Sequence, residues 1–251
     1  MEKNPWLSHR TARTDAKLRL FCFPYAGAGG AIYRDWAKSL PAHIDVCPVE
    51  PPGRFARSKE KQPRSMSEFI DGIERGLDDM LDLPFACFGY SLGALMAFEW
   101  ARSLRRRRGI EPRCMVVAAS RAPHVPARLP PISHLPASEF LRRVQQRYGA
   151  FDRVIQEDPE LLQLVGKIMQ VDLEVLERYE CRDEAPFTCP FTAIGGTDDP
   201  GAKREDLDAW GSHTVGGCDV RMVDGDHFFI RTRGQELLDI VRSAVQAPGA
   251  A

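Results

Sequence analysis

The sequence lacks a dominant charge of either sign. Its 251 residues carry 34 lysines and arginines against 35 aspartates and glutamates, so the formal net charge is −1. A chain so close to neutrality has no global electrostatic field that would draw it to nucleic acid or to a membrane surface. We therefore expect neither of these as a partner.

Long hydrophobic runs and a signal sequence are missing as well. No apolar stretch approaches the ~20 residues that a helix needs to cross a bilayer. Residues 1–17 are polar and lack the apolar segment of a secretory signal. We expect a cytoplasmic protein.

Paired cysteine spacing is also absent. The seven cysteines are odd in number and form no C-x-x-C motif. Five of them lie inside apolar, strand-like runs: Cys22, Cys47, Cys87, Cys114 and Cys189. We interpret these as small buried thiols in a reducing compartment, and a disulfide framework is not expected.

Short apolar runs alternate with amphipathic stretches along most of the chain. The runs predict strands at 18–24, 46–49, 85–90, 115–119, 189–195 and 220–223. Helices are predicted after Ser65, which forms a capping box with Glu68, and over 92–106 and 235–245. This alternation is typical of an α/β protein with a mostly parallel sheet covered by helices on both faces.

The alternation stops between residues 123 and 180. Five prolines within 123–136 precede two predicted helices, the second beginning at Asp158 and Pro159. The apolar stripe of this second helix is wider than one helix face requires. Two interpretations stay open: a kinked or broken helix buried on two sides, and a lid that lines an acyl channel. We expect a helical lid insertion at 123–180 in an α/β core made of residues 1–122 and 181–251.

The strongest local signal is the pentapeptide Gly89-Tyr90-Ser91-Leu92-Gly93. It follows a predicted strand and begins a predicted helix, which is the context of the G-x-S-x-G nucleophile elbow. The glycines permit the tight turn, which exposes the serine hydroxyl near the positive end of a helix. A glycine-rich turn with an incidental serine is the alternative. The placement favours Ser91 as a nucleophile.

A serine hydroxyl needs a base, and this fold requires the chain order serine, acid, histidine. Of the six histidines, His227 follows the last predicted strand and precedes the last helix. His213 precedes that strand, and we rank it lower. The acid should follow the strand at 189–195, where both Asp198 and Asp199 lie; we prefer Asp199.

An oxyanion hole needs two backbone amides. One belongs to Leu92, the residue after the nucleophile. The other should come from the loop at 24–30, and we favour Ala26. The glycines of this loop could also cradle a phosphate, but the G-x-G-x-x-G order and the later acidic residue of a dinucleotide site are missing.

With these residues placed, the chain resembles the type II thioesterases that accompany polyketide synthases and nonribosomal peptide synthetases. The similarity covers nearly everything from Leu18 to Val245. The matching pieces are FCFPYAGAGG (21–30), EPPGR (50–54), GYSLGALMAFEWA (89–101), SHLPASEFLRRV (133–144), VDLEVLERYE (171–180), GGTDDP (195–200), AWGSHT (209–214) and DGDHFF (224–229). The FPYAGAGG and PGR pieces are more specific than the elbow. PGR itself is interpreted as a turn without a catalytic role.

The resemblance implies an α/β-hydrolase fold and hydrolysis of acyl groups from the phosphopantetheine arm of acyl or peptidyl carrier proteins. It implies Ser91 as nucleophile, His227 as base and Asp199 as acid, with the Ala26 and Leu92 amides binding the oxyanion. The inserted helices match the mobile lid of the family. We expect no metal and no cofactor in the hydrolase, because phosphopantetheine belongs to the partner.

Two details bear on specificity. Histidine is frequent in the family where this chain has Tyr90, and since that residue flanks the nucleophile we expect it to affect substrate preference. The basic run at 105–108 could meet an acidic carrier protein or could be a solvated helix end, and we favour the helix end. The wide apolar stripe of the lid predicts tolerance of aliphatic acyl groups.

Other functions stay open. An esterase or acyltransferase of the same fold would use the same three residues. A catalytically silent scaffold that binds carrier proteins is opposed by the intact serine, aspartate and histidine. Met1 and the lack of a carrier segment lead us to expect a stand-alone chain. The acyl chain, the pathway, the oligomeric state and the choice between editing and product release are not indicated.

Overall fold

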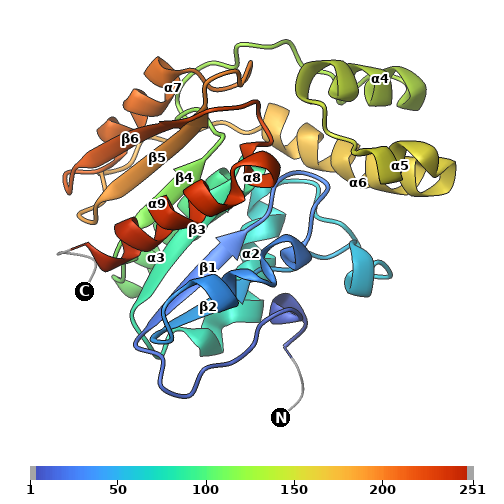
Figure 1. Ribbon diagram of the computed structural model, residues 1–251. Helices are drawn as coiled ribbons and strands as arrows, with labels where there is room; N and C mark the ends of the chain where they lie inside the picture. Colours follow the sequence, from blue (N-terminus) through green and yellow to red (C-terminus); the bar gives the residue numbers. More distant parts are fainter. Residues whose placement is uncertain (1–3, 248–251) are drawn as a thin grey trace.

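Six parallel strands form one sheet in the computed structural model, which describes residues 4–247 (Figure 1). Their order across the sheet is β2-β1-β3-β4-β5-β6. The strands are β1 (Leu18–Phe23), β2 (Ile44–Pro48), β3 (Phe85–Tyr90), β4 (Met115–Ala118), β5 (Phe191–Gly196) and β6 (Cys218–Val223). Each lies within two residues of a predicted strand. The predicted α/β class with a mostly parallel sheet is confirmed.

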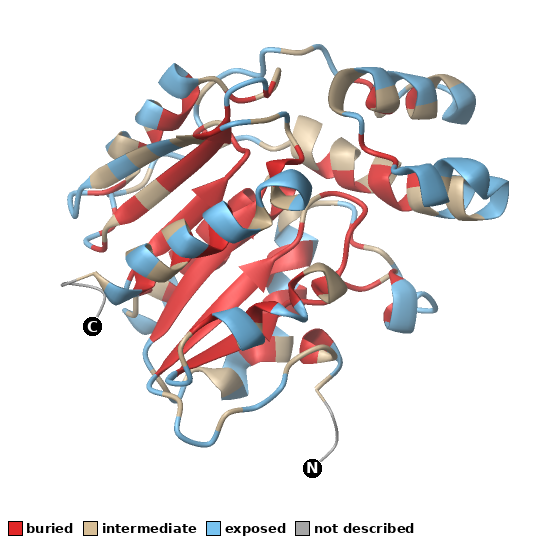
Figure 2. Cartoon of the chain, viewed as in Figure 1, coloured by how far each residue is buried: buried red, intermediate tan, exposed pale blue. Residues whose placement is uncertain are grey.

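Each face of the sheet has its own hydrophobic core. Helices α2 (Met66–Leu77) and α3 (Leu92–Arg108) cover one face, and α1 (Trp36–Ser39) and α9 (Gly234–Gln246) cover the other (Figure 1). Along β1, Phe21 and Phe23 join the first core, whereas Leu20 and Cys22 join the second. Figure 2 shows the central strands buried along their length, while the edge strand β6 is partly exposed. Burial on both faces explains why the central strands have continuous apolar sequences.

The strand order creates a crevice at one end of the sheet. Strand β1 lies between β2 and β3. The chain therefore passes from β1 to β2 on one side of β1 and then crosses back to form β3 on the other side. The connection after β1 contributes α1 to one face, and the connection after β3 contributes α3 to the opposite face. Where neighbouring connections diverge in this way, a ligand crevice forms at the carboxyl ends of the strands. Here it lies between the loop after β1 and the turn at Ser91.

Three helices lie between β4 and β5 in sequence and gather beside this end of the sheet (Figure 1). They are α4 (Ala137–Tyr148), α5 (Arg153–Glu157) and α6 (Pro159–Glu177). As predicted, Asp158 caps α6: its Oδ1 accepts hydrogen bonds from the amides of Glu160 and Leu161 at 3.1 and 3.0 Å. We call residues 123–180 the inserted segment.

Helix α6 is continuous from Pro159 to Glu177, so the break that one of the two interpretations allowed is absent from it. Its sequence has no proline after the first position. Gly166 allows α4 to approach closely, since a Cβ there would lie 2.4 Å from Leu141 Cδ2. The wide apolar stripe is explained instead by contacts with α4, with the core and with a cavity described below.

Shorter helices that the sequence patterns did not reveal complete the fold. They include α7 (Arg204–Asp208) and α8 (Phe229–Thr232), which follow β5 and β6. Each is too short to show a helical period. Across residues 4–247, no helix combines the length and the hydrophobicity that crossing a membrane requires.

Candidate active site

Ser91 occupies the turn between β3 and α3 with φ = 54° and ψ = −117°. A positive φ is strained for a residue with a Cβ. The turn is held because the Ser91 amide donates to the Ala118 carbonyl at 2.8 Å. A Cβ on Gly89 would lie 2.3 Å from the Gly93 oxygen, and one on Gly93 would lie 2.1 Å from the Phe23 oxygen. Both glycines are therefore required by the close packing of β1, β3 and α3.

A chain of hydrogen-bonding side chains leads away from the serine. His227 lies in the loop between β6 and α8, and its Nε2 is 3.1 Å from Ser91 Oγ. Its Nδ1 is 2.8 Å from Oδ2 of Asp199, which follows β5. The Asp199 side chain is fully buried, and its Oδ1 accepts from the Gly201 amide at 2.8 Å. The structure thus brings together the three residues selected from the sequence.

The two lower-ranked residues lie elsewhere. Asp198 is exposed, while its backbone amide donates to the Gly225 carbonyl at 2.9 Å. His213 packs against Trp210, and its Nε2 is 2.8 Å from Nδ1 of His124. Neither side chain takes part in the hydrogen-bond chain at Ser91.

Two backbone amides remain available beside the serine. Ala26 lies in the loop after β1 and lines the same cavity as Ser91. Leu92 is the first residue of α3. Within residues 4–247, neither amide donates to a protein acceptor. They are therefore free to bind an oxygen that develops negative charge.

The loop that carries Ala26 is anchored by two carboxylates. Gly27 has φ = 82°, and its amide donates to Asp172 Oδ2 of helix α6 at 2.7 Å. The Gly30 amide donates to Glu50 Oε2 at 2.9 Å. Burial raises the pKa of Glu50. The loop is thus held by Glu50, which follows β2, and by Asp172 of the inserted segment.

Sequence reasoning missed the part that Arg54 plays in this anchor. The PGR stretch was interpreted as a turn, but the Arg54 side chain is fully buried and forms an ion pair with Asp172. Gln62 Nε2 donates to Asp172 Oδ1 at 2.9 Å. The available signal was a charged residue, Asp172, inside the apolar stripe of α6. Its partner, 118 residues away, had no sequence signature.

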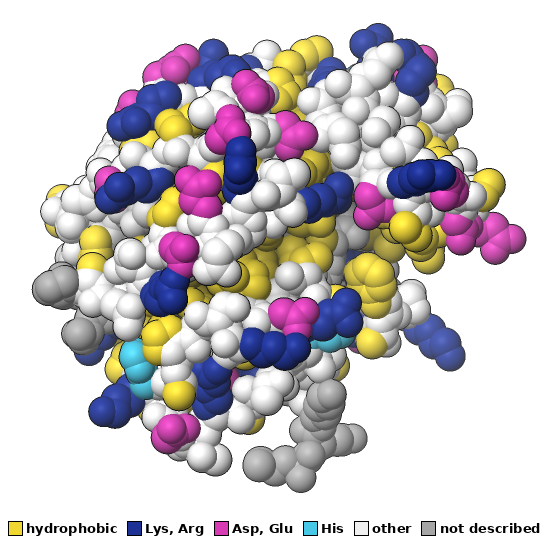
Figure 3. All heavy atoms as spheres, viewed as in Figure 1, with side chains coloured by type: hydrophobic (Ala, Val, Ile, Leu, Met, Phe, Trp, Pro, Cys, Tyr) yellow, Lys and Arg dark blue, Asp and Glu magenta, His cyan; other side chains and the backbone are white. Residues whose placement is uncertain are grey.

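A cavity of about 190 Å³ lies next to Ser91 and His227. Its walls come from the loop after β1, the segment after β4 and the inserted segment, including Met169, Leu173 and Leu176 of α6. Figure 3 shows hydrophobic side chains gathered between the core and the inserted helices. An apolar side of α6 thus lines a cavity, as the second interpretation of this helix requires, while a role as a lid over an acyl channel stays a prediction.

Tyr90 has a different part from the one expected. Its side chain is fully buried among residues of the core beneath α9, and it is not on the cavity wall. Its hydroxyl donates to the His227 carbonyl at 2.6 Å. Tyr90 therefore supports the loop that carries His227. Its side chain does not line the cavity, so no direct contact with a substrate there accounts for the expected effect on substrate preference.

The basic run at the end of α3 is engaged within the molecule. The pairs are Arg105 with Glu111 and Glu184 (3.4 and 3.2 Å), Arg106 with Glu184 (2.5 Å), Arg107 with Glu74, and Arg108 with Asp78 (3.2 Å). Four cations that already have carboxylate partners present little free charge to an acidic protein. The arrangement favours the structural interpretation of this run.

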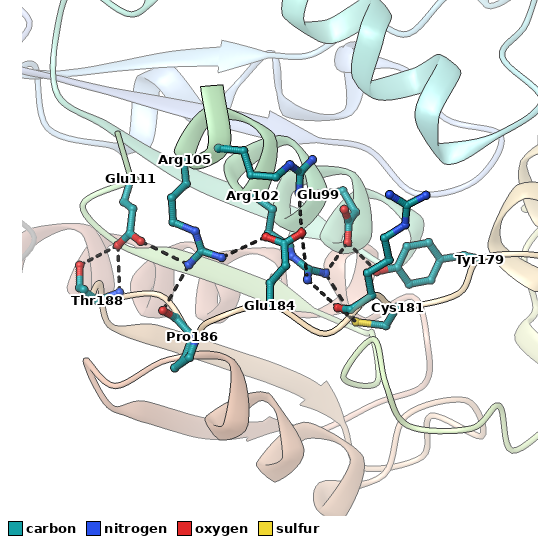
Figure 4. A network of polar contacts seen from close by, with 11 residues as sticks. Glu99, Arg102, Arg105, Glu111, Tyr179, Cys181, Glu184, Pro186 and Thr188 are labelled. Atoms are coloured by element: carbon teal, nitrogen blue, oxygen red, sulfur yellow. Dashed lines mark hydrogen bonds and ion pairs between the residues drawn. The ribbon is translucent and has the colours of Figure 1, made fainter. Parts of the chain in front are cut away.

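The same network fastens the end of the inserted segment to α3 (Figure 4). The Tyr179 hydroxyl donates to Glu99 Oε1 at 2.7 Å. Arg102 donates to the Arg182 carbonyl at 2.5 Å, and Arg105 donates to the Pro186 carbonyl at 3.2 Å. The chain leaving α6 is thus tied to the helix that follows Ser91.

The buried cysteines offer no rival nucleophile. All seven are free, and the five predicted to be buried are buried. Burial raises the pKa of Cys114 and of Cys189 to about 12, so both stay as thiols at neutral pH. Among the described residues, no three His, Cys, Asp or Glu side chains form a group that could hold a metal ion.

Comparison with known proteins places the chain in one family. A family model described as a thioesterase domain matches residues 18–245. The chain is 38% identical over 244 residues to linear gramicidin dehydrogenase LgrE of Brevibacillus parabrevis, covering 96% of this chain and 93% of that protein. It is 32% identical over 238 residues to gramicidin S biosynthesis protein GrsT of Aneurinibacillus migulanus, covering 95% and 93%. The solved structure of RedJ, a thioesterase from the prodiginine biosynthetic pathway in Streptomyces coelicolor, superposes with a TM-score of 0.86 at 32% identity, covering 93% and 92%.

Proposed function

The chain belongs to the thioesterase family, and we propose that it hydrolyses acyl groups from the phosphopantetheine thiol of acyl or peptidyl carrier proteins in polyketide or nonribosomal peptide biosynthesis. The observation that carries this proposal is the hydrogen-bonded series Ser91, His227 and Asp199 beside an apolar cavity under the inserted helices. The biosynthetic roles in the names of GrsT and RedJ support the choice of pathway.

In the first half of the reaction, Ser91 Oγ attacks the thioester carbonyl carbon while its proton passes to His227 Nε2. The oxygen that becomes negative is stabilised by the amides of Ala26 and Leu92, each worth ~3 kcal/mol in the transition state. The carbon–sulfur bond then breaks, and the departing sulfur takes the proton from His227. The acyl group remains on Ser91 as an ester.

In the second half, a water molecule gives a proton to His227 Nε2 as its oxygen attacks the ester carbonyl. The bond to Oγ breaks, Ser91 regains the proton, and the carboxylic acid leaves. Asp199 accepts the Nδ1 hydrogen bond of His227 and stabilises the imidazolium without taking the proton. The reaction as written uses no metal or cofactor, and the phosphopantetheine arrives with the carrier protein.

The name of LgrE suggests a second function, that of a dehydrogenase. If hydride transfer used a dinucleotide, the chain would need a site for its pyrophosphate. The glycine-rich loop after β1 would then have to bind a pyrophosphate through free amides. Here the amides of Gly27 and Gly30 already donate to Asp172 and Glu50 at 2.7 and 2.9 Å. Occupied amides favour hydrolysis over hydride transfer at this loop.

The proposal is tested by incubating acyl-loaded carrier protein with the wild type and with Ser91→Ala, and by following the carrier by intact mass spectrometry. We expect the wild type alone to remove the acyl group and to restore the free thiol. A free ester of the same acid, and an added alcohol acceptor, test for an esterase and an acyltransferase. Turnover of the free ester without turnover of the carrier would contradict the proposal. Loss of the acyl group with both proteins would contradict the role of Ser91, and no turnover of any substrate would favour a silent scaffold.

A further inference from the structure

Apart from His227, four charged residues line the cavity beside Ser91, and three of them are already engaged. Arg128 pairs with Asp206 and Glu205. Arg147 donates to the Pro130 carbonyl at 2.7 Å. The Glu177 carboxylate accepts hydrogen bonds from the Ile132 amide (2.7 Å) and from the amide and hydroxyl of Ser133. The fourth residue is Arg121.

The Arg121 guanidinium has no partner within residues 4–247. The residue is partly buried, its Nε has no hydrogen-bond acceptor, and among the described residues the group forms no ion pair with a carboxylate. Burial lowers the pKa of Arg121. The Asp206 carboxylate attracts it from farther away, but already accepts from Arg128 and from the Lys203 amide. A cation that is partly desolvated and has no protein partner is unfavourable, and it gains from an anion that enters the cavity.

The backbone around Arg121 is held rigidly. The Ala119 amide donates to the Ile194 carbonyl at 2.8 Å, and the Ala122 amide donates to the Asp206 carbonyl at 3.0 Å. Between them, the Ser120 carbonyl accepts from the Trp210 indole at 2.9 Å. These hydrogen bonds fix the backbone from which the Arg121 side chain extends. Arg121 comes three residues after Ala118, whose carbonyl accepts the hydrogen bond of the Ser91 amide. Such preorganisation lowers the cost of binding a ligand.

We propose that Arg121 binds a carboxylate carried by the acyl group, so that the enzyme prefers carboxyacyl thioesters over neutral acyl thioesters of the same shape. Dicarboxylic half-thioesters and acidic aminoacyl groups belong to this class. The planar guanidinium matches a carboxylate with two parallel hydrogen bonds. The inference rests on the proposed function, because the carboxylate is held at one end of the acyl group while Ser91 attacks the other end.

The test compares substrates in which a carboxylate is replaced by an isopropyl group of similar shape. The carrier protein is loaded with malonyl, succinyl or glutaryl and, as matched partners, with 3-methylbutanoyl, 4-methylpentanoyl or 5-methylhexanoyl. In the pair whose length fits, we expect kcat/KM of the wild type to favour the carboxylate by on the order of tenfold or more, as a charge-assisted hydrogen bond allows. Equal rates, or faster hydrolysis of the branched partner in all three pairs, would overturn the inference.

Variants then assign the preference to one side chain. Arg121→Met keeps an apolar stem and removes the charge, so the carboxylate preference should disappear while hydrolysis of the branched substrate is unchanged or faster. Arg121→Lys should restore part of the preference. Arg147→Met is the matched control, since Arg147 lines the same cavity and has a protein acceptor. An equal loss on both substrates in Arg121→Met would show a structural role and contradict the inference.

The failure of this inference and that of the proposed function are distinguishable. Hydrolysis of the branched substrates that depends on Ser91 and shows no preference for a carboxylate leaves the thioesterase function standing and removes the role of Arg121. Absence of hydrolysis with every loaded carrier protein counts against the proposed function itself. Should Arg121→Met not fold, inhibition of the wild type by succinate against 4-methylpentanoate gives the same comparison without a variant, and equal inhibition contradicts the inference.

Discussion

The Asp172 carboxylate of helix α6 accepts a hydrogen bond of 2.7 Å from the Gly27 amide, which comes 145 residues earlier in the chain. Gly27 follows Ala26, one of the two amides assigned to the oxyanion. The same carboxylate pairs with the buried Arg54. One side chain of the inserted segment therefore connects the wall of the cavity beside Ser91 with the loop that would stabilise the transition state.

This connection predicts that Asp172→Asn affects both stability and catalysis. The substitution leaves the Arg54 charge buried without a counterion, which costs about 3–5 kcal/mol when a buried pair is broken. We also expect kcat to fall tenfold or more, on the order of the effect of a displaced oxyanion donor. The free energy of unfolding in urea and the steady-state rate on a carrier-bound thioester measure the two effects.

The matched control for Asp172→Asn is Gln62→Ala. Gln62 donates to Asp172 and to the Ile168 carbonyl, so its loss removes hydrogen bonds but keeps the ion pair. We expect a cost of ~1–2 kcal/mol and little change in kcat. Equal effects of the two substitutions would show that the ion pair has no special part in holding the loop.

Asp199→Asn and Asp198→Asn form a second matched pair. Asp199 holds His227 Nδ1 at 2.8 Å, whereas Asp198 is exposed. An amide at position 199 no longer stabilises the imidazolium and favours the wrong tautomer, so kcat should fall by about 10²–10⁴. The neighbouring substitution should change kcat less than twofold. Comparable losses in both variants, measured on one thioester under saturating conditions, would remove Asp199 from its assigned role.

The local parts of the site could be predicted because the sequence carries them in short, contiguous patterns. Ser91 sits in a turn whose strand, glycines and helix are neighbours in the chain, and His227 follows the last strand directly. Arg54 and Asp172 could not be paired from the sequence, because their contact is created by the packing of a helix 118 residues away. A buried ion pair leaves no periodic pattern, and the sequence alone gives no reason to prefer one of the many possible partners.

The course of α6 shows the same limit. The sequence indicated a long helix with a proper cap, and both are present. Its wide apolar stripe suggested a kink, yet the surplus side chains face α4, the core and the cavity. Hydrophobic periodicity indicates how much of a helix surface is buried, but it does not identify the elements against which that surface packs. Likewise, nothing in the sequence distinguishes the unpaired Arg121 from the paired Arg128.

The nucleophile elbow predicts a large effect for Gly93→Ala. A Cβ at this position would lie 2.1 Å from the Phe23 oxygen, so β1 or the start of α3 must move. Both movements displace the Ser91 turn, and we expect a loss of about 3 kcal/mol or more in unfolding free energy together with most of the activity. Thermal unfolding and the thioester assay measure these losses.

Gly234→Ala is the control for the elbow glycine. Gly234 begins α9, and nothing lies within 4 Å of a Cβ placed on it. Alanine lowers the entropy of the unfolded chain and favours a helix, so stability should stay equal or rise by up to ~1 kcal/mol. If Gly93→Ala were tolerated as well as Gly234→Ala, the close packing of β1 against α3 would not be what requires the glycine.

The half-buried His213, which lies beside the exposed His124, predicts a pH dependence of stability away from the active site. The His213 ring packs against Phe98 and lies beside His124 and within reach of the charges of Arg102 and Asp183. Burial, followed by the neighbouring His124, lowers the pKa of His213 to about 4. In the unfolded chain the pKa of a histidine is about 6.5. Below about pH 6.5 the unfolded state binds a proton at this histidine that the folded state does not bind. The folded protein therefore loses stability as the pH falls from about 6.5 toward 4. Above about pH 6.5 the histidine is neutral in both states and the stability is not reduced.

His213→Gln should therefore flatten the decline of the unfolding free energy between pH 6.5 and 4. The difference in slope stays below that of one whole proton, because the ring is only half-buried and solvent screens its charge. Urea unfolding at half-unit intervals of pH measures the slope, and the same substitution at the exposed His134 controls for the loss of a histidine. If His213→Gln leaves the slope unchanged, the pair of His124 and His213 is not a source of acid sensitivity. The decline in unfolding free energy would then come from carboxylates that lose their ion pairs on protonation.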